Sequence, residues 1–164
     1  MKVIWIDPGE TVGWATFRVD TKAPSIELLD YGNTKLRPFA MKLLEVAHEY
    51  DWICFETYAI RADKLKQHAG STVPTLQLVG MIRLAQWEGQ RRNGTGFPQL
   101  DEQDPGFKKR GYGAMKLWLP GEIELVDEAL AGRHDDGHFG DAVMHAAAWF
   151  HERWGKDVKH VRAK

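Results

Sequence analysis

The sequence contains a single cysteine, Cys54, among 164 residues. One cysteine excludes an intramolecular disulfide and any cysteine-rich zinc site. Because Cys54 lies inside the apolar run WICF, we expect it to be buried in the core. No apolar run approaches the roughly 18 residues of a membrane span, and the N-terminal MKVIWIDPGE has no signal-peptide pattern. The expected location is therefore the cytoplasm, with no membrane partner.

An excess of charge of either sign is also missing, since 22 Lys and Arg residues oppose 23 Asp and Glu residues and give a formal net charge of −1. A protein that binds a polyanion must then carry a locally basic surface. Basic residues do cluster, at Arg61, Lys64 and Lys66 and again at Lys108 and Lys109. For any one such cluster, an ordinary solvated surface is the more common explanation.

No internal repeat, long linker or low-complexity block divides the chain. The hydrophobic content of 43% and the mean hydropathy of −0.44 suit a globular protein with one substantial core. We therefore predict one domain over residues 1–164.

The order of the apolar segments predicts an α/β fold. Residues 2–6, 13–19 and 25–33 are rich in strand-forming residues and indicate an antiparallel meander, with Pro8, Gly9 and Gly13 marking its first turn. Helical spacing over 38–50 and the short apolar run 52–55 then predict a crossover to a buried strand. Helices are predicted over 72–87, 111–119 and 138–154, and a last strand over 97–100.

Two carboxylates end predicted strands. Asp7 opens an Asp-Pro-Gly turn, so its side chain should project from the strand end, although such a tripeptide alone is usually simple turn chemistry. Glu56 closes WICFE, a run so apolar that we expect its strand to be buried on both faces. A glutamate in that place needs a partner, and capping or a salt bridge is the alternative to metal binding.

His138 and Asp141 open the last predicted helix, three residues apart, so they face the same side and can converge on one ion. Imidazole nitrogen and carboxylate oxygen suit Mn²⁺ as well as Mg²⁺. His134, Asp135 and Asp136 precede them as further candidates, but we expect the two aspartates to cap the helix. Clustered carboxylates repel one another unless cations lie between them, which favours a divalent-metal site.

In this order the motifs resemble the RuvC-like branch of the ribonuclease-H-like nucleases, the Holliday junction resolvases. IWIDPGETVGWATF resembles the opening strand, acid, glycine turn and second strand, and ICFE resembles the second acidic strand. LQLVGMIRLA resembles the helix after the second acid, and HFGDAVMHAAAWF the terminal H-x-x-D-A helix. Each motif alone is weak, whereas several in order over nearly the whole chain are specific. The opening motif also suits a phage-encoded member, located in the host cytoplasm.

The resemblance implies a ribonuclease-H-like mixed five-stranded sheet, with three antiparallel strands and then parallel strands, flanked by helices. It implies that Asp7 bridges two Mg²⁺ or Mn²⁺ ions, that Glu56 and Asp141 complete their shells, and that His138 binds metal or orients the water. Two ions about 3.5 to 4 Å apart stabilise the attacking and leaving oxygens of an in-line displacement. The expected activity is cleavage of branched DNA, above all Holliday junction resolution.

The resemblance further implies that Lys108 and Lys109 contact phosphates and that Arg61, Lys64 and Lys66 line the DNA path. A resolvase of this family works as a homodimer that cuts two symmetry-related strands.

The predicted helix 72–87 can supply the dimer interface, unless its apolar face is core. Ala59 stands where the family often has an aromatic residue that helps to open the junction. A broader flap or fork nuclease, an RNA-processing nuclease and a non-catalytic nucleic-acid-binding module remain alternatives. An actin-like ATPase is not favoured, because it needs a longer chain and a second phosphate-binding glycine motif.

Overall fold

The computed structural model describes residues 1–57, 73–93, 98–103, 108–131 and 137–155. Its centre is a five-stranded sheet in the order β3-β2-β1-β4-β5. The first three strands are antiparallel and the last two run parallel to β1. The strands are β1 (Lys2–Asp7), β2 (Thr11–Asp20), β3 (Ser25–Lys35), β4 (Trp52–Glu56) and β5 (Gln99–Gln103). The predicted fold class is confirmed.

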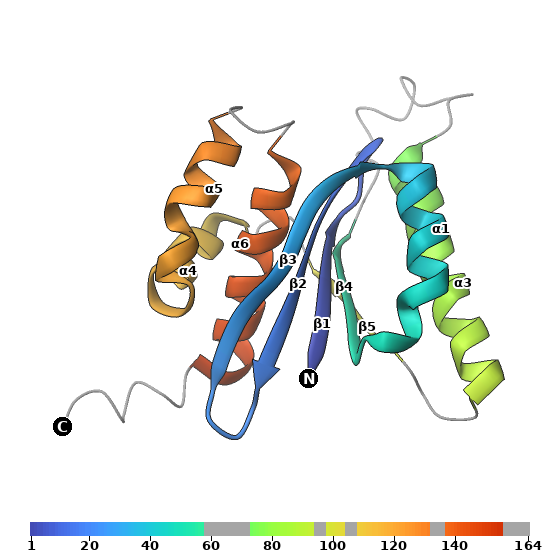
Figure 1. Ribbon diagram of the computed structural model, residues 1–164, viewed down its shortest axis with the longest axis horizontal. Coiled ribbons are helices and arrows are strands. Elements are labelled where there is room, and N and C mark those ends of the chain that lie inside the picture. Colours follow the sequence, from blue (N-terminus) through green and yellow to red (C-terminus); the bar gives the residue numbers. More distant parts are fainter. Residues whose placement is uncertain (58–72, 94–97, 104–107, 132–136, 156–164) are drawn as a thin grey trace.

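Helices cover both faces of the sheet (Figure 1). One face carries α1 (Leu36–Val46) and α3 (Pro74–Asn93), and the other carries α4 (Lys108–Trp118), α5 (Ile123–Leu130) and α6 (His138–Phe150). Short turns of 3-10 or π helix follow α1, α4 and α6, at Ala47–Glu49, Pro120–Glu122 and His151–Gly155. Within the described ranges, no helix is long and apolar enough to cross a membrane.

The sheet separates two apolar cores, because alternate residues of each strand point to opposite faces. In β4, Ile53 and Phe55 pack toward α1 and α3, while Cys54 packs toward α6. All three side chains are 0% exposed. The predictions that this strand is buried on both faces and that Cys54 is a core residue are therefore confirmed.

Several predicted boundaries differ from the structure. Gly13 lies within β2, paired with Asp7, so the turn is shorter than predicted. The last strand begins at Gln99 rather than at position 97, and its polar sequence reflects its place at the edge of the sheet. The short helix α5 was not predicted; it is held by burial of Val126 and Ala129.

Candidate metal centre

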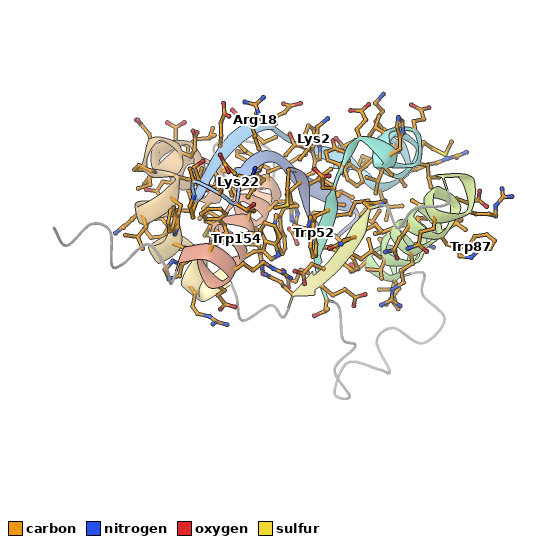
Figure 2. All side chains as sticks on the ribbon, turned by 90° about the horizontal axis from the view of Figure 1, so that it is seen from below. Lys2, Arg18, Lys22, Trp52, Trp87 and Trp154 are labelled. Carbon is orange, nitrogen blue, oxygen red and sulfur yellow. The ribbon has the colours of Figure 1, made fainter. Side chains whose placement is uncertain are left out.

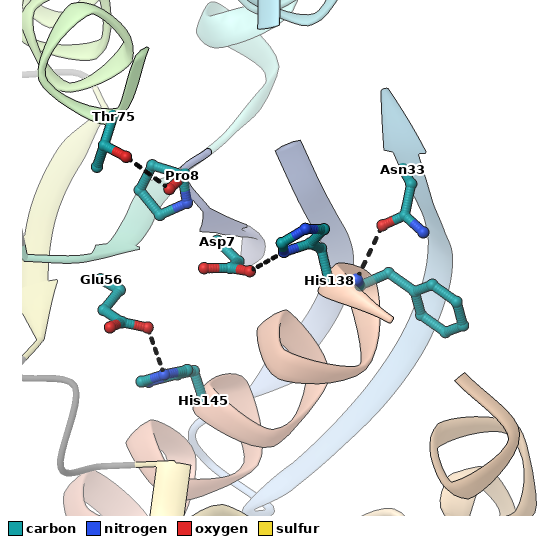
Figure 3. Close-up of polar contacts among 8 residues, drawn as sticks. Asp7, Pro8, Asn33, Glu56, Thr75, His138 and His145 are labelled. Atoms are coloured by element: carbon teal, nitrogen blue, oxygen red, sulfur yellow. Dashed lines mark hydrogen bonds and ion pairs between the residues drawn. The ribbon is translucent and has the colours of Figure 1, made fainter. Parts of the chain in front are cut away.

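The carboxyl ends of β1 and β4 place two acids side by side. The strands are parallel neighbours, with Ile6 paired to Phe55, so Asp7 and Glu56 follow at the same edge of the sheet. The hydroxyl of Thr75, at the start of α3, donates to the carbonyl oxygen of Pro8 over 3.1 Å and so fastens the turn after Asp7 (Figure 3).

Helix α6 begins directly over this edge, and Gly13 is the reason that it can. A Cβ atom at Gly13 would lie 2.2 Å from the main-chain carbon and oxygen of His138, so only glycine admits the start of the helix here. Gly13 is also the register partner of both Asp7 on β1 and Asn33 on β3. A row of residues across three strands therefore supports the helix start.

Asn33 completes this support by accepting a hydrogen bond from the backbone N–H of Phe139 over 3.0 Å (Figure 3). It satisfies a donor of the first turn, which is the part usually played by an N-cap side chain. The N-cap position itself is Gly137, with φ of 67°. The prediction that Asp135 or Asp136 caps the helix concerns residues outside the described ranges; in the structure, Asn33 from a distant strand acts on the first turn.

His138 points from the first turn of α6 to Asp7. Its Nδ1 lies 2.8 Å from Asp7 Oδ2, where an ionised carboxylate accepts a hydrogen bond. When the proton of the neutral imidazole is on Nδ1, the lone pair of Nε2 is left to bind an ion or orient a water molecule. Both roles predicted for His138 are thus chemically open to it.

Asp7 is in an unfavourable place for a negative charge. Its side chain is only 15% exposed. Burial raises the pKa of Asp7 above its usual value, the bond from His138 opposes that shift, and the charges of Asp141 and Glu56 raise the pKa further. The charges of Glu56 and Asp141 thus both act on Asp7, and a cation would relieve this repulsion.

A second histidine, His145, lies at the same site and was not among the predicted residues. Its Nε2 is 3.1 Å from Glu56 Oε2 (Figure 3). His138, Asp141 and His145 follow one another at intervals of three and four, which is the spacing of one helix face. That spacing was the signal in the sequence that pointed to His145.

The donor chemistry of the site fits a divalent cation. Among the described residues, no group of three or more histidine, cysteine or carboxylate side chains already encloses one point as a metal cage. The side chains form pairs instead, Asp7 with His138 and Glu56 with His145. Mg²⁺ commonly binds through one or two carboxylates, with water and substrate phosphate as its other ligands, and the carboxylates of Asp7 and Glu56 suit that mode.

The predicted DNA-contacting residues are not placed by the structure. Arg61, Lys64 and Lys66 lie outside the described residues, as do His134, Asp135 and Asp136. Lys108 and Lys109 open α4, but the positions of their side chains are not described.

No protein-family model and no curated protein sequence matches the chain. Solved structures do match, and the chain shares its fold with solved Holliday junction resolvases. The resemblance seen in the sequence motifs is confirmed at the level of fold.

Three such structures match nearly the whole chain. RuvC of T. thermophilus, in complex with a Holliday junction substrate, has a TM-score of 0.58 and 21% identity, over 94% of this chain and 97% of that one. The yeast mitochondrial resolvase Ydc2 has a TM-score of 0.57 and 16% identity, over 98% of this chain and 82% of that one. The fowlpox virus resolvase, in complex with junction DNA, has a TM-score of 0.59 and 12% identity, over 92% of this chain and 99% of that one.

Proposed function

We propose that this protein is a metal-dependent endonuclease that cleaves phosphodiester bonds in branched DNA, and that its principal substrate is the Holliday junction. The observation that carries the proposal is the convergence of Asp7, Glu56, His138 and Asp141 at one edge of a sheet with the resolvase fold. Two of the similar resolvases were solved with junction DNA.

The carboxylates and the histidine have different tasks in this proposal. Asp7, Glu56 and Asp141 hold the two ions, Mg²⁺ or Mn²⁺, through carboxylate oxygens. Bound divalent ions would supply an activated water and charge stabilisation at the phosphodiester. His138 is oriented by Asp7 at 2.8 Å, so its Nε2 is directed for binding an ion or holding the water.

The substrate is tested with labelled four-way junctions, Y-forks and linear duplex, each with Mg²⁺ or Mn²⁺. Paired symmetric nicks in the junction are the expected result. Equal cutting of forks would replace the proposal with a broader branch nuclease. If no DNA is cut with either metal, the assignment fails, and an RNA substrate or a binding role takes its place.

We further propose a homodimer, and the outer face of α3 supports it. Leu76, Leu84 and Trp87 are 44%, 49% and 58% exposed, and they share one stripe of the helix with Gly80. A Cβ at Gly80 would meet nothing within 4 Å. Trp87 projects from α3 at the outer margin of the molecule (Figure 2). In the single chain this stripe is exposed rather than core, and an apolar helix face of this kind suits a second copy.

Several further expectations stay predictions. For DNA binding, these are phosphate contacts by Lys108 and Lys109 and a DNA path along Arg61, Lys64 and Lys66. For the whole protein, they are a phage origin, a cytoplasmic location and a single domain over residues 1–164.

A further inference from the structure

His145 is a buried imidazole with no assigned task in the proposed cleavage. It is 1% exposed and stacks on Trp5, with ring centroids 5.5 Å apart and 16° between the ring planes. Trp5, on which His145 stacks, belongs to β1, while the edge of the His145 ring is directed at Glu56 at the end of β4 (Figure 3). The ring is thus held in one orientation with Nε2 toward a predicted metal ligand.

Neither nitrogen of His145 makes a hydrogen bond within the part of the chain that the structure describes. Nε2 is 3.1 Å from Glu56 Oε2, but the two groups are not aligned as a hydrogen bond. Buried polar atoms nearly always have a partner, so an unsatisfied one indicates a missing water or ion.

A second unsatisfied atom lies next to Glu56. Gln103 is the register partner of Glu56 on β5, and its buried Oε1 has no hydrogen-bond partner in the described residues. Paired residues of neighbouring strands point to the same face of a sheet, so Gln103 lies on the α6 side with Glu56 and His145. Residues of three elements, Glu56 of β4, Gln103 of β5 and His145 of α6, thus lie on this side of the sheet with buried or half-buried polar groups.

We propose that His145 Nε2 is a nitrogen ligand of a divalent cation held by Glu56. Two donor atoms that bind one ion at about 2.1 Å and at right angles lie about 3 Å apart. The observed separation of 3.1 Å between Nε2 and Oε2 has this value without hydrogen-bond alignment. The inference rests on the proposed function, because it adds a ligand to that same site.

A nitrogen ligand changes the metal preference of the site. Mg²⁺ favours oxygen donors, whereas imidazole favours transition metals and raises the affinity for Mn²⁺. We therefore infer that the protein discriminates in favour of Mn²⁺ more strongly than its carboxylates alone would allow.

The test is a titration of the full chain with Mn²⁺, without DNA, followed by electron paramagnetic resonance. His145→Phe keeps an aromatic ring against Trp5 and removes both nitrogens. We expect Mn²⁺ affinity at one ion to fall by about tenfold or more, one nitrogen hyperfine coupling to disappear, and Mg²⁺ affinity to fall less. His48→Phe removes an exposed imidazole and should change none of these three quantities.

Equal Mn²⁺ affinity and an unchanged nitrogen coupling in His145→Phe would overturn the assignment. If that variant does not fold by circular dichroism, His145→Leu carries the same test, because its side chain removes both ring nitrogens and adds no donor atom. Junction cleavage by the wild type is measured in parallel. If the wild type cuts no DNA but the nitrogen coupling disappears in His145→Phe, the proposed function is contradicted and His145 is supported as a ligand. Wild type that cuts junctions, with Mn²⁺ binding unchanged in the variant, overturns the His145 assignment alone.

Discussion

At the scale of one residue, the buried charge of Asp7 lowers the stability of the folded, metal-free protein. A carboxylate is stable when solvent or donors surround it, yet Asp7 is largely buried and faces two further carboxylates. Its pKa is raised chiefly by burial, so the folded protein holds the Asp7 proton more tightly than the unfolded chain does. Stability of the metal-free protein therefore falls as pH rises from the ordinary aspartate value through the raised one.

Asp7→Asn is expected to make the metal-free protein more stable at neutral pH and to abolish cleavage while DNA binding persists. The amide removes the buried charge but keeps an oxygen that can accept the hydrogen bond from His138. A gain of about 1 kcal/mol would raise the Tm by about 2 to 4 °C at this chain length. Thermal unfolding in a chelator checks the stability, and the gain should vanish at a pH below the ordinary pKa of aspartate.

Asp20→Asn is the control for this prediction. The backbone N–H groups of Lys22 and Ala23 donate to its carboxylate and lower its pKa. Its substitution should therefore not stabilise the protein. If Asp7→Asn lowered the Tm at neutral pH, burial and repulsion would not be the dominant influences on Asp7.

At the scale of elements, the site depends on how closely α6 approaches the sheet. Gly13 provides that approach, since nothing larger than hydrogen fits between β2 and the backbone of His138. We expect Gly13→Ala to cost at least about 1 to 3 kcal/mol of stability, because backbone must move, and to reduce cleavage by displacing His138 from Asp7. Urea unfolding and junction cleavage measure the two effects.

Gly113→Ala in α4 is the matched control, because a Cβ there meets nothing within 4 Å. It should leave cleavage unchanged and keep or slightly raise the stability, since alanine favours helix. Normal cleavage by a stable Gly13→Ala protein would show that the helix start does not depend on this contact.

The sequence predicted elements better than it predicted the contacts between them. Apolar periodicity located all five strands and four of the five described α-helices, because burial patterns repeat along the chain. The two acids at strand ends and the histidine and aspartate on α6 followed from the same patterns. The support from Gly13 and Asn33 did not, because it depends on the register between strands that are distant in sequence.

At the scale of the whole molecule, the proposed metal site and the proposed dimer interface involve helices on different faces of the sheet. Helix α6, which contributes to the candidate metal site, and helix α3 lie on opposite faces of the sheet (Figure 1). The apolar stripe of α3 consists of Leu76, Gly80, Leu84 and Trp87. Two copies joined through α3 would each carry a metal site. Such an arrangement suits a substrate with two equivalent strands.

The double variant Leu84→Glu and Trp87→Glu is expected to turn a dimer of the 18.7 kDa chain into a monomer, because charges would face each other across an apolar interface. Analytical ultracentrifugation measures the mass. Leu117→Glu, on the exposed side of α4 at 47% exposure, should leave the dimer intact. A wild type that is monomeric at the concentrations where it cuts junctions would contradict the proposal.

The most direct test of the central claim is the rate of nicking of one labelled four-way junction by wild type and by Asp7→Asn, with Mn²⁺ and with a chelator. The account predicts paired nicks only for wild type with metal, a loss of about three orders of magnitude or more in Asp7→Asn, and similar junction binding by both proteins. Metal-independent nicking, or full activity in Asp7→Asn, would contradict it.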